Sequence, residues 1–155
     1  MTDHTTRPLT AADIPALKAI LDATELFPSD MLEAMVAGYL DKVDHDLWLV
    51  SEAGGIVTGF AYSEPERMTD RTWNLLALAV SPDHQKRGIG ATLIDATRAA
   101  LKAKNVRMLM IETADILEFE GQRAFYQRMG LAQVAHIPEY YEAGVGKVSF
   151  AQQLN

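Results

Sequence analysis

Near the start of the chain, apolar residues recur at intervals of three and four, which is the spacing of one helical face. One such face consists of Ile14, Leu17, Ile20 and Leu21, and a second of Leu32, Met35, Val36, Tyr39 and Leu40. Thr10, with Asp13 three residues later, is typical of a capping box before the first helix, and Ser29 is a candidate cap for the second. We therefore expect two short amphipathic helices, separated by a segment that contains Phe27.

The pattern then changes to short apolar runs bounded by turn residues, which is typical of strands. Residues 47–50 and 56–62 flank the pair Gly54-Gly55 and predict a β-hairpin. Gly59 interrupts the second of these strands, so we expect a bulge or a close backbone approach there. Residues 72–80 form a longer apolar run, which predicts a buried central strand.

A third helical face follows the central strand and consists of Ile89, Leu93, Ile94, Thr97, Ala100 and Leu101. Residues 107–112 predict a further strand after it, and this order of strand, helix and strand implies a right-handed parallel crossover. The last part of the chain predicts a helix at 122–129 ended by Gly130, strands at 131–136 and 147–152, and a turn at 140–146. The pattern as a whole predicts an α/β fold with a mixed sheet flanked by helices.

Length and composition favour one globular domain over residues 1–155. The chain has 155 residues, of which 48% are hydrophobic, and it contains no cysteine. No apolar run is long enough to cross a membrane, and the polar start of the chain, MTDHTTRPLT, has no signal-peptide core. We expect a cytoplasmic protein without disulfides. No metal site is expected either, because the charged segment DKVDHD at 41–46 lacks a recognisable ligand spacing.

The net charge of −7 changes the range of partners to expect. Nucleic-acid binding is disfavoured, because affinity for phosphate backbones requires a basic face. An acidic surface instead attracts cationic partners such as amines, lysine side chains or basic peptides. The charge is equally consistent with a role in solubility alone.

Within this acidic chain, the residues after the central strand form a basic turn that opens a helix. The turn reads Gln85-Lys86-Arg87-Gly88-Ile89-Gly90. The first N–H groups of a helix have no intrahelical partner and carry partial positive charge, and glycine lets an anion approach the backbone closely. A phosphate site is therefore predicted. It is not a dinucleotide-binding fingerprint, because Leu93 stands at the third glycine position, and the chain contains no Walker A motif. An ordinary turn with an exposed basic patch is the alternative.

The string Q-x-x-G-x-G, preceded by Leu-Ala-Val-Ser-Pro, resembles the acyl-coenzyme A pyrophosphate loop of the GNAT N-acetyltransferase superfamily. Further along, Phe125-Tyr126 and Gly130-Leu131 resemble the family's FYxxxGF segment, with Leu131 where phenylalanine is usual. The order of the elements also agrees. The resemblance is strong over the second half of the chain, whereas the first half matches only in its pattern of elements.

The resemblance implies a GNAT acyl-CoA N-acyltransferase fold, with acetyl-CoA as co-substrate. In that family the pantetheine arm pairs with the backbone of the central strand and the pyrophosphate lies on the helix start. Carried over to this chain, the coenzyme-binding residues are Leu78, Ala79, Val80, Gln85, Lys86, Arg87, Gly88, Ile89, Gly90 and Ala91. The implied reaction is direct attack of a primary amine on the thioester, in a ternary complex.

The resemblance also implies catalytic residues. Tyr126, by its place in the FYxxxG segment, corresponds to the general acid that protonates the leaving thiolate. Glu112, at the end of its strand, corresponds to the general base of some family members, although a carboxylate in solvent or in an ion pair is an equal alternative. Asn74 stands where other members carry an acidic residue and cannot act as a base, so proton removal through water, or attack by an amine that is already deprotonated, remains open.

Acceptor binding is the least determined part. Phe27 corresponds to a loop that lines the acceptor side in this fold, or else is a hydrophobic staple onto the second helix. Tyr140 and Tyr141 are expected to wall the amine pocket from a turn. Ribosomal-protein N-terminal acetyltransferases usually carry Asn seven residues before the tyrosine, where this chain has Phe119, so that activity is not assigned. A homodimer is an expectation of the family only.

Three functions therefore stand side by side. The first is an acetyl-CoA-dependent N-acetyltransferase that acts on a small-molecule, peptide or protein amine. The second is a non-catalytic acyl-CoA sensor or partner-binding module, which would have no need of Tyr126. The third is an acyltransferase that uses another donor, such as succinyl- or propionyl-CoA.

Overall fold

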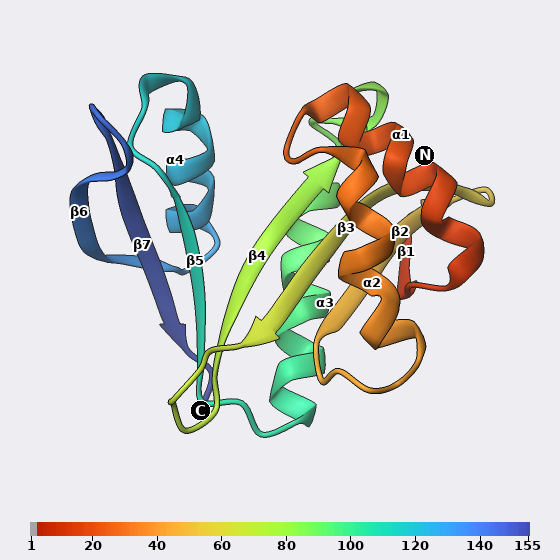
Figure 1. Cartoon of the computed structure of the whole chain (residues 1–155), viewed down its shortest axis with the longest axis horizontal. Helices are drawn as coiled ribbons and strands as arrows, with labels where there is room; N and C mark the ends of the chain where they lie inside the picture. Colours follow the sequence, from red (N-terminus) through yellow and green to blue (C-terminus); the bar gives the residue numbers. More distant parts are fainter. Residues whose placement is uncertain (1–2) are drawn as a thin grey trace. The chain divides into compact units, whose positions relative to one another are not determined.

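The protein is described by a computed structural model that covers residues 3–155 (Figure 1). Seven strands form a mixed sheet in the order β1-β2-β3-β4-β5-β7-β6. The chain divides into two compact units, the first made of the residues up to 64 with 77–100, and the second of residues 65–76 and 101–155. The single domain expected over residues 1–155 stays a prediction.

The first unit contains β1 (Thr5–Pro8), α1 (Ile14–Thr24), α2 (Leu32–Leu40), β2 (Leu47–Ala53), β3 (Ile56–Pro65), the second half of β4 (Thr72–Val80) and most of α3 (Ile89–Ala103). The apolar faces predicted for the first two helices pack on the strands. Their fully buried members are Leu17, Leu21, Leu32 and Val36, which join a cluster around Trp48 and Phe60. Trp48 also stacks on Tyr62, with 4.1 Å between the ring centroids. This core fixes α1 and α2, and with them the segment between the two helices.

The polar start of the chain forms a strand, β1, which the hydrophobic pattern did not predict. Thr5–Pro8 pairs antiparallel with β2. Arg7 donates two hydrogen bonds to the Asp13 carboxylate, at 2.7 and 2.8 Å, and Asp13 in turn accepts one from the N–H of Thr10 at 2.8 Å. The predicted capping box is therefore confirmed. The cap predicted at Ser29 is wrong, because Ser29 lies inside a short 3-10 turn and α2 begins at Leu32.

At Gly59 the structure has both the bulge and the close backbone approach that were predicted as alternatives. The register of β2 and β3 shifts beside it, since Ser51 pairs with Gly59 but Glu52 pairs with Val57. A Cβ at position 59 would lie 2.8 Å from the carbonyl oxygen of Ala79. The close approach of β3 to β4 therefore requires glycine at this position.

The second unit contains the start of β4, β5 (Met108–Ala114), α4 (Glu120–Arg128), β6 (Ala132–Glu142) and β7 (Val145–Gln153). The parallel crossover is confirmed: Thr72 to Leu75 of β4 pair in parallel with Met108 to Ile111 of β5. β7 pairs antiparallel with both β5 and β6. After α4, Gly130 has φ +92°, and the N–H groups of Gly130 and Leu131 bond to the carbonyls of Gln127 and Tyr126, which is a Schellman motif.

The turn predicted at 140–146 is wrong, because Tyr140 and Tyr141 lie on β6. The pairing of β6 with β7 is interrupted after Ile137 and resumes at Glu142, which faces Val145. Pro138 has no N–H to donate to the ladder, and four residues bulge at this point. The tight turn itself is at residues 143–144, where Gly144 has φ +81°.

Within residues 3–155, no helix combines the length and the apolar character needed to cross a membrane.

Candidate active site

The loop between β4 and α3 has a backbone shaped for an anion. The N–H of Ser81 bonds to the carbonyl of Thr58 at 2.8 Å, and the side-chain amide of Gln85 donates to the carbonyl of Val80 at 3.2 Å. Lys86 and Gly88 both have positive φ, of 64° and 79°. These conformations turn the chain sharply, so that the loop passes from the end of β4 into the first turn of α3.

The first turn of α3 is held in place by hydrogen bonds and by a buried side chain, whereas its first N–H groups have no partner within the helix. Both the N–H and the hydroxyl of Thr92 donate to the carbonyl of Gly88, at 3.0 and 2.9 Å, so the helical hydrogen bonds begin there. The N–H groups of Ile89, Gly90 and Ala91 consequently lie in the turn that has no intrahelical acceptors. Ile89 is buried and fixes this turn in the core. Apart from its two chain neighbours, no described residue would lie within 4 Å of a Cβ at position 88.

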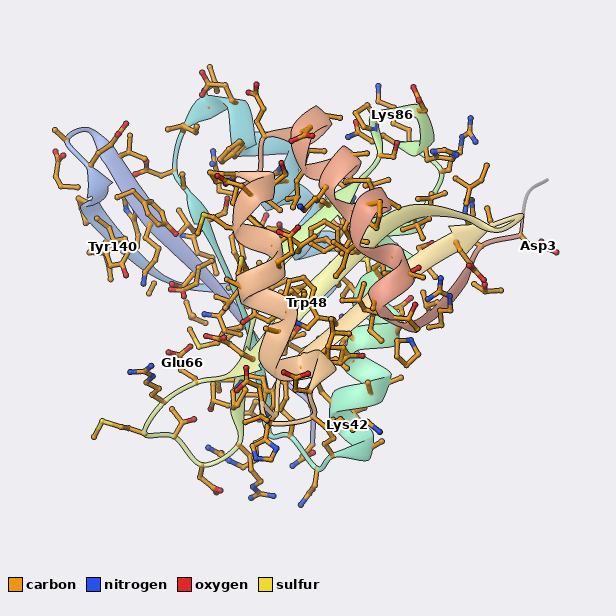
Figure 2. All side chains as sticks on the ribbon, turned by 45° about the vertical axis from the view of Figure 1, so that its right-hand side comes forward. Asp3, Lys42, Trp48, Glu66, Lys86 and Tyr140 are labelled. Atoms are coloured by element: carbon orange, nitrogen blue, oxygen red, sulfur yellow. The ribbon has the colours of Figure 1, made fainter. Side chains whose placement is uncertain are left out.

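The positive charges of the loop lie beside this helix start. Lys86 and Arg87 are exposed, and Lys86 projects from the loop in Figure 2. Leu78, Ala79 and Val80, the residues predicted to pair with pantetheine, form the end of β4 just before the loop. All residues predicted to bind coenzyme therefore belong to the first unit. The dipole and the free N–H groups at the start of α3, together with the cations Lys86 and Arg87, are suited to a phosphate group.

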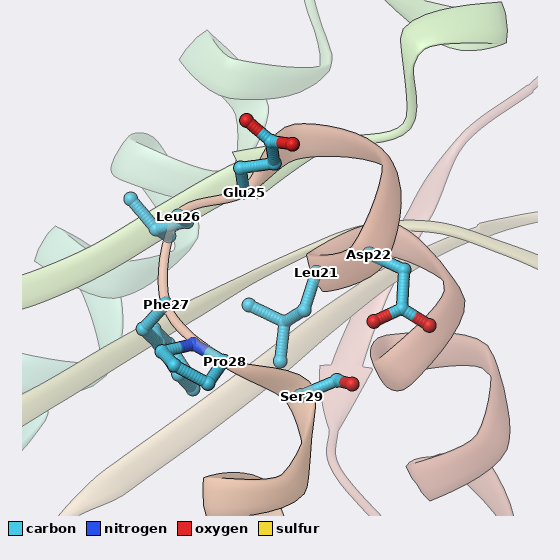
Figure 3. Close-up of a pocket in the computed structure, with 7 residues that line it drawn as sticks. All are labelled: Leu21, Asp22, Glu25, Leu26, Phe27, Pro28 and Ser29. Atoms are coloured by element: carbon cyan, nitrogen blue, oxygen red, sulfur yellow. The ribbon is translucent and has the colours of Figure 1, made fainter.

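Phe27 lies at a surface hollow of the first unit, of about 460 Å³. Asp22 and Glu25 reach it from the end of α1, and Phe27 and Ser29 from the segment that leads into α2 (Figure 3). Phe27 is also partly buried against the core cluster. Both predictions for it, a packing role and a lining role, are therefore compatible with its position. The two carboxylates give the hollow a negative lining.

Glu112 is the centre of a polar network in the second unit. Its carboxylate is 2.7 Å from Lys147 Nζ, and it accepts hydrogen bonds from Asn74 Nδ2 at 2.7 Å and Ser149 Oγ at 3.2 Å. Burial raises the pKa of Glu112, but the hydrogen bonds from Lys147 and Asn74 outweigh burial and hold this pKa below its ordinary value. The sequence left Glu112 as a general base, a carboxylate in solvent or a member of an ion pair. In the structure Glu112 forms an ion pair with Lys147, and this ion pair favours the ionised carboxylate.

Tyr140 and Tyr141 lie beside this network. Their rings meet edge to face with centroids 4.9 Å apart, and Lys147 Nζ lies 3.9 Å from the centroid of Tyr140. Burial, followed by the charge of Glu112, raises the pKa of Tyr141. The strand β6 thus brings both tyrosines to Glu112, although through a bulged strand and not through the predicted turn.

Tyr126 points from α4 into an aromatic cluster. Its ring contacts Phe125 and Phe150, with centroids 5.8 and 5.7 Å away, and the residue is 8% exposed. Burial raises the pKa of its hydroxyl to about 12. The phenol is therefore a proton donor over the whole physiological range of pH.

The two predicted catalytic residues lie on opposite faces of the β5–β7 pair. Side chains alternate along a strand. Glu112 and its register partner Ser149 bond to each other on one face, so Ile111 and Phe150 occupy the other. Tyr126 packs on Phe150, which places α4 on that second face. Tyr126 and Glu112 therefore project from opposite faces of this pair of strands.

Sequence reasoning missed Lys147 and Ser149 as partners of Glu112. Residues 145, 147 and 149 share one face of the strand that carries them. The alternation of faces along this strand was the available signal. It could not indicate which strand lies next to β7. Asn74 was excluded as a base, but its position as a donor to Glu112 was not predicted.

Comparison with known proteins agrees with this arrangement. Residues 43–130, more than half of the chain, match the sequence model of the acetyltransferase (GNAT) domain. The chain therefore belongs to the GNAT acetyltransferase family. Among curated proteins, none matches it in sequence.

Solved structures share the fold over nearly the whole chain. A protein assigned to the GNAT family from Desulfovibrio desulfuricans is 22% identical, with a TM-score of 0.89 over 99% of this chain and 100% of that one. The ribosomal-protein-S18-alanine N-acetyltransferase of Escherichia coli is 20% identical, with a TM-score of 0.81 over 99% and 95% of the two chains. The Salmonella typhimurium protein yncA, solved with its cofactor acetyl-CoA, is 20% identical, with a TM-score of 0.79 over 98% and 94%. At these identities the likeness concerns the fold.

Proposed function

We propose that this protein transfers an acetyl group from acetyl-CoA to a primary amine of a small molecule, peptide or protein, by direct attack in a ternary complex. The observation that carries this proposal is the loop after β4. It combines positive backbone φ angles, a free helix start and two cations in an otherwise acidic member of an acetyltransferase family.

In this proposal the pyrophosphate of coenzyme A lies on the backbone N–H groups of Lys86 to Ala91, with Lys86 and Arg87 adding positive charge. Helix starts of this kind bind phosphate because the dipole and the unpaired N–H groups act together. The pantetheine arm pairs with backbone groups of Leu78, Ala79 and Val80. The binding is therefore mostly to the backbone, and it depends on the glycines more than on any side chain.

The chemistry requires an ammonium acceptor to lose two protons, one before and one after it attacks, and the leaving group to gain one. Glu112 accepts the first proton from the acceptor ammonium, and the amine lone pair then attacks the thioester carbonyl carbon. The carbon–sulfur bond breaks, Tyr126 protonates the thiolate as it leaves, and the second proton of the attacking nitrogen replaces the one that Tyr126 gave up. Positioning the two reactants and transferring these protons are each worth several orders of magnitude in rate.

The proposal for the acceptor rests on the charges and rings found in each unit by itself. Tyr140 lies against Lys147, the ion-pair partner of Glu112, and the charge of Glu112 raises the pKa of Tyr141. Aromatic rings near a carboxylate favour a cationic amine. The hollow at Phe27, with Asp22 and Glu25, has the same preference for positive charge.

The test is calorimetric titration with acetyl-CoA beside free coenzyme A, followed by thiol release in the presence of a panel of amines. Binding of acetyl-CoA together with thiol release on some amine would support the proposal and identify the acceptor class. Binding without release on any amine would favour a non-catalytic sensor. Faster release from propionyl- or succinyl-CoA would favour another donor, and no binding at all would refute the coenzyme site.

A further inference from the structure

The two oxygens of Glu112 are held in different ways. Oε2 is bonded to Lys147 Nζ at 2.7 Å and to Ser149 Oγ at 3.2 Å. Oε1 accepts a single bond, from Asn74 Nδ2 at 2.7 Å. A carboxylate oxygen offers about two lone-pair positions. Within the described residues, both positions on Oε2 are therefore used, whereas Oε1 keeps one free.

The orientation of Asn74 is fixed by what surrounds it. The side-chain amide also donates to Glu66 Oε2 at 3.3 Å, and Asn74 itself is only 3% exposed. Two carboxylates can only accept, so the amide nitrogen must be the atom that faces them. An aspartate at position 74 would instead bring three carboxylates together. Asparagine at this place therefore supports the neighbouring carboxylate of Glu112 without competing with it for a proton.

Lys147 is held as firmly as the carboxylate it faces. Its side chain is 14% exposed, and its ammonium lies between Glu112 and the ring of Tyr140, 3.9 Å from the ring centroid. A cation over an aromatic face is attracted by the ring, more strongly when water is excluded. Lys147 therefore fixes the position of Oε2 and offsets the charge of Glu112.

From this geometry we infer that Asn74 and Lys147 are positioning residues for Glu112, and that Oε1 is the atom that takes the proton of the acceptor ammonium. This inference rests on the proposed function. In the step, the N–H bond of the ammonium breaks and its electron pair stays on nitrogen. The proton forms a bond with the free lone pair of Oε1, while Oε2 keeps both of its partners.

The charges around Glu112 set how the step depends on pH. Glu66 precedes β4, Lys147 comes from β7, and Tyr140 and Tyr141 come from β6. Lys147 is the cation in direct contact with the carboxylate, and it holds the pKa of Glu112 down together with Asn74. Without Lys147, burial remains, and burial disfavours the charged form. The pKa of Glu112 must then rise, and the base becomes protonated at a higher pH.

The experiment compares kcat/KM against pH for the wild type and for Lys147→Met, with an amine accepted by the wild type. An opposite charge in contact shifts a pKa by about 1–3 units, so the acidic limb of the Lys147→Met profile should move up by about one unit or more. Lys147→Arg, which keeps the charge, should return the limb to within a few tenths of a unit of the wild type. Lys18→Met removes a lysine that pairs with Glu33 on the first unit, and it serves as the matched control with an unchanged profile.

A second readout does not depend on turnover. The pKa of the Glu112 carboxyl is measured by carbon NMR titration in the wild type, Lys147→Met and Asn74→Ala, each checked for folding by circular dichroism. The inference predicts that this pKa and the acidic limb move up together. A limb that stays in place while the carboxyl pKa moves would overturn it, as would a Glu112 pKa that is unchanged in Lys147→Met. Failure of the proposed function would be seen separately, as a wild type without acetyl-CoA binding or thiol release.

Asn74→Ala tests the contribution of Oε1. Within residues 3–155, this change removes the only hydrogen bond that reaches the reacting oxygen, and it leaves Lys147 and Ser149 in place. Misplacing a reacting group by about 1 Å can cost on the order of a hundredfold in rate, so we expect kcat on the pH plateau to fall at least about tenfold. Acetyl-CoA affinity should stay the same. An unchanged plateau kcat in folded Asn74→Ala would remove Asn74 from the positioning of Glu112.

Discussion

The packing around Tyr126 keeps its hydroxyl in the protonated form. The ring packs against Phe125 and Phe150, and burial raises the pKa of its hydroxyl to about 12. The adjoining Schellman motif fixes the end of α4 on which the ring depends. A phenol with this pKa keeps its proton throughout the physiological range of pH.

Tyr126→Phe should therefore lower turnover without affecting coenzyme binding. Loss of one positioned acid typically costs about 10²–10⁴-fold in rate, and we expect kcat to fall by about a hundredfold. The dissociation constant of acetyl-CoA, measured by calorimetry, should change less than twofold. Tyr39→Phe is the control, because that hydroxyl bonds to the carbonyl of Leu9 and takes no part in the proposed chemistry. Equal turnover in the two variants would exclude Tyr126 from the mechanism.

At the scale of single residues, the sequence indicated which side chains to consider but not what they contact. Glu112 was chosen from a family position, and its partners Lys147 and Asn74 come from two other strands. The register of β5 with β7 decides that Ser149 and Lys147 share a face with Glu112. Such register depends on long-range pairing, which no local pattern of residues contains.

At the scale of elements, the strand, loop and helix around Gly88 form the unit that the sequence predicted best. The strand was expected at 72–80 and is observed at Thr72–Val80, and the buried face of α3 contains the predicted residues Ile89, Leu93, Ile94, Thr97 and Leu101. Local signals suffice here, because a long apolar run, a Pro and two glycines occur within a few residues. β1 was not predicted, since an edge strand needs only backbone pairing and its residues are polar.

Gly88→Glu should weaken coenzyme binding strongly. A side chain at this φ of +79° is strained by about 1–2 kcal/mol, and its carboxylate would occupy the positive helix start in place of phosphate. We expect the dissociation constant of acetyl-CoA to rise at least about tenfold, which corresponds to 1.4 kcal/mol. Gly54→Glu introduces the same charge at φ +57° in the hairpin turn between β2 and β3, where the surroundings are equally open. It should bind acetyl-CoA normally, and normal binding in both variants would refute the phosphate-loop assignment.

The contact between β1 and the first helix makes a separate prediction about acid stability. The hydrogen bonds from Arg7 hold the pKa of Asp13 below its ordinary value. A carboxyl with a lowered folded-state pKa contributes stability above its unfolded pKa, and this contribution is lost as the pH falls through the folded pKa. Asp13 is 5% exposed, so its charge cannot be left without a partner at low cost.

Arg7→Met should therefore destabilise the protein by about 1–3 kcal/mol at pH 7, as measured by urea unfolding. The difference from the wild type should shrink below about pH 4, where the unfolded carboxyl begins to protonate. Lys18→Met, which breaks an exposed pair with Glu33, should cost at most about 1 kcal/mol at either pH. A constant difference between Arg7→Met and wild type from pH 7 to pH 3 would show that Asp13 is not the linked group.

At the scale of the whole molecule, the two proposed substrates require opposite charges on the protein. The chain carries a net charge of −7, yet coenzyme A is an anion and the proposed acceptor is a cation. The first demand is met locally, by Lys86, Arg87 and the start of α3. The second is met by the remaining surface, including Asp22 and Glu25 at the hollow near Phe27.

The salt dependence of the reaction should therefore differ between acceptors. With acetyl-CoA kept saturating, kcat/KM for a trivalent cationic amine should fall about three- to tenfold between 20 and 300 mM salt, because exposed charges are screened beyond the Debye length. A monovalent amine of similar size should change by less than about twofold, since the attraction scales with the charge of the ligand. Steady-state kinetics at four salt concentrations would measure both slopes. If the two amines lost activity in parallel, the effect would lie in the protein or in coenzyme binding, and the acidic surface would have no part in selecting the acceptor.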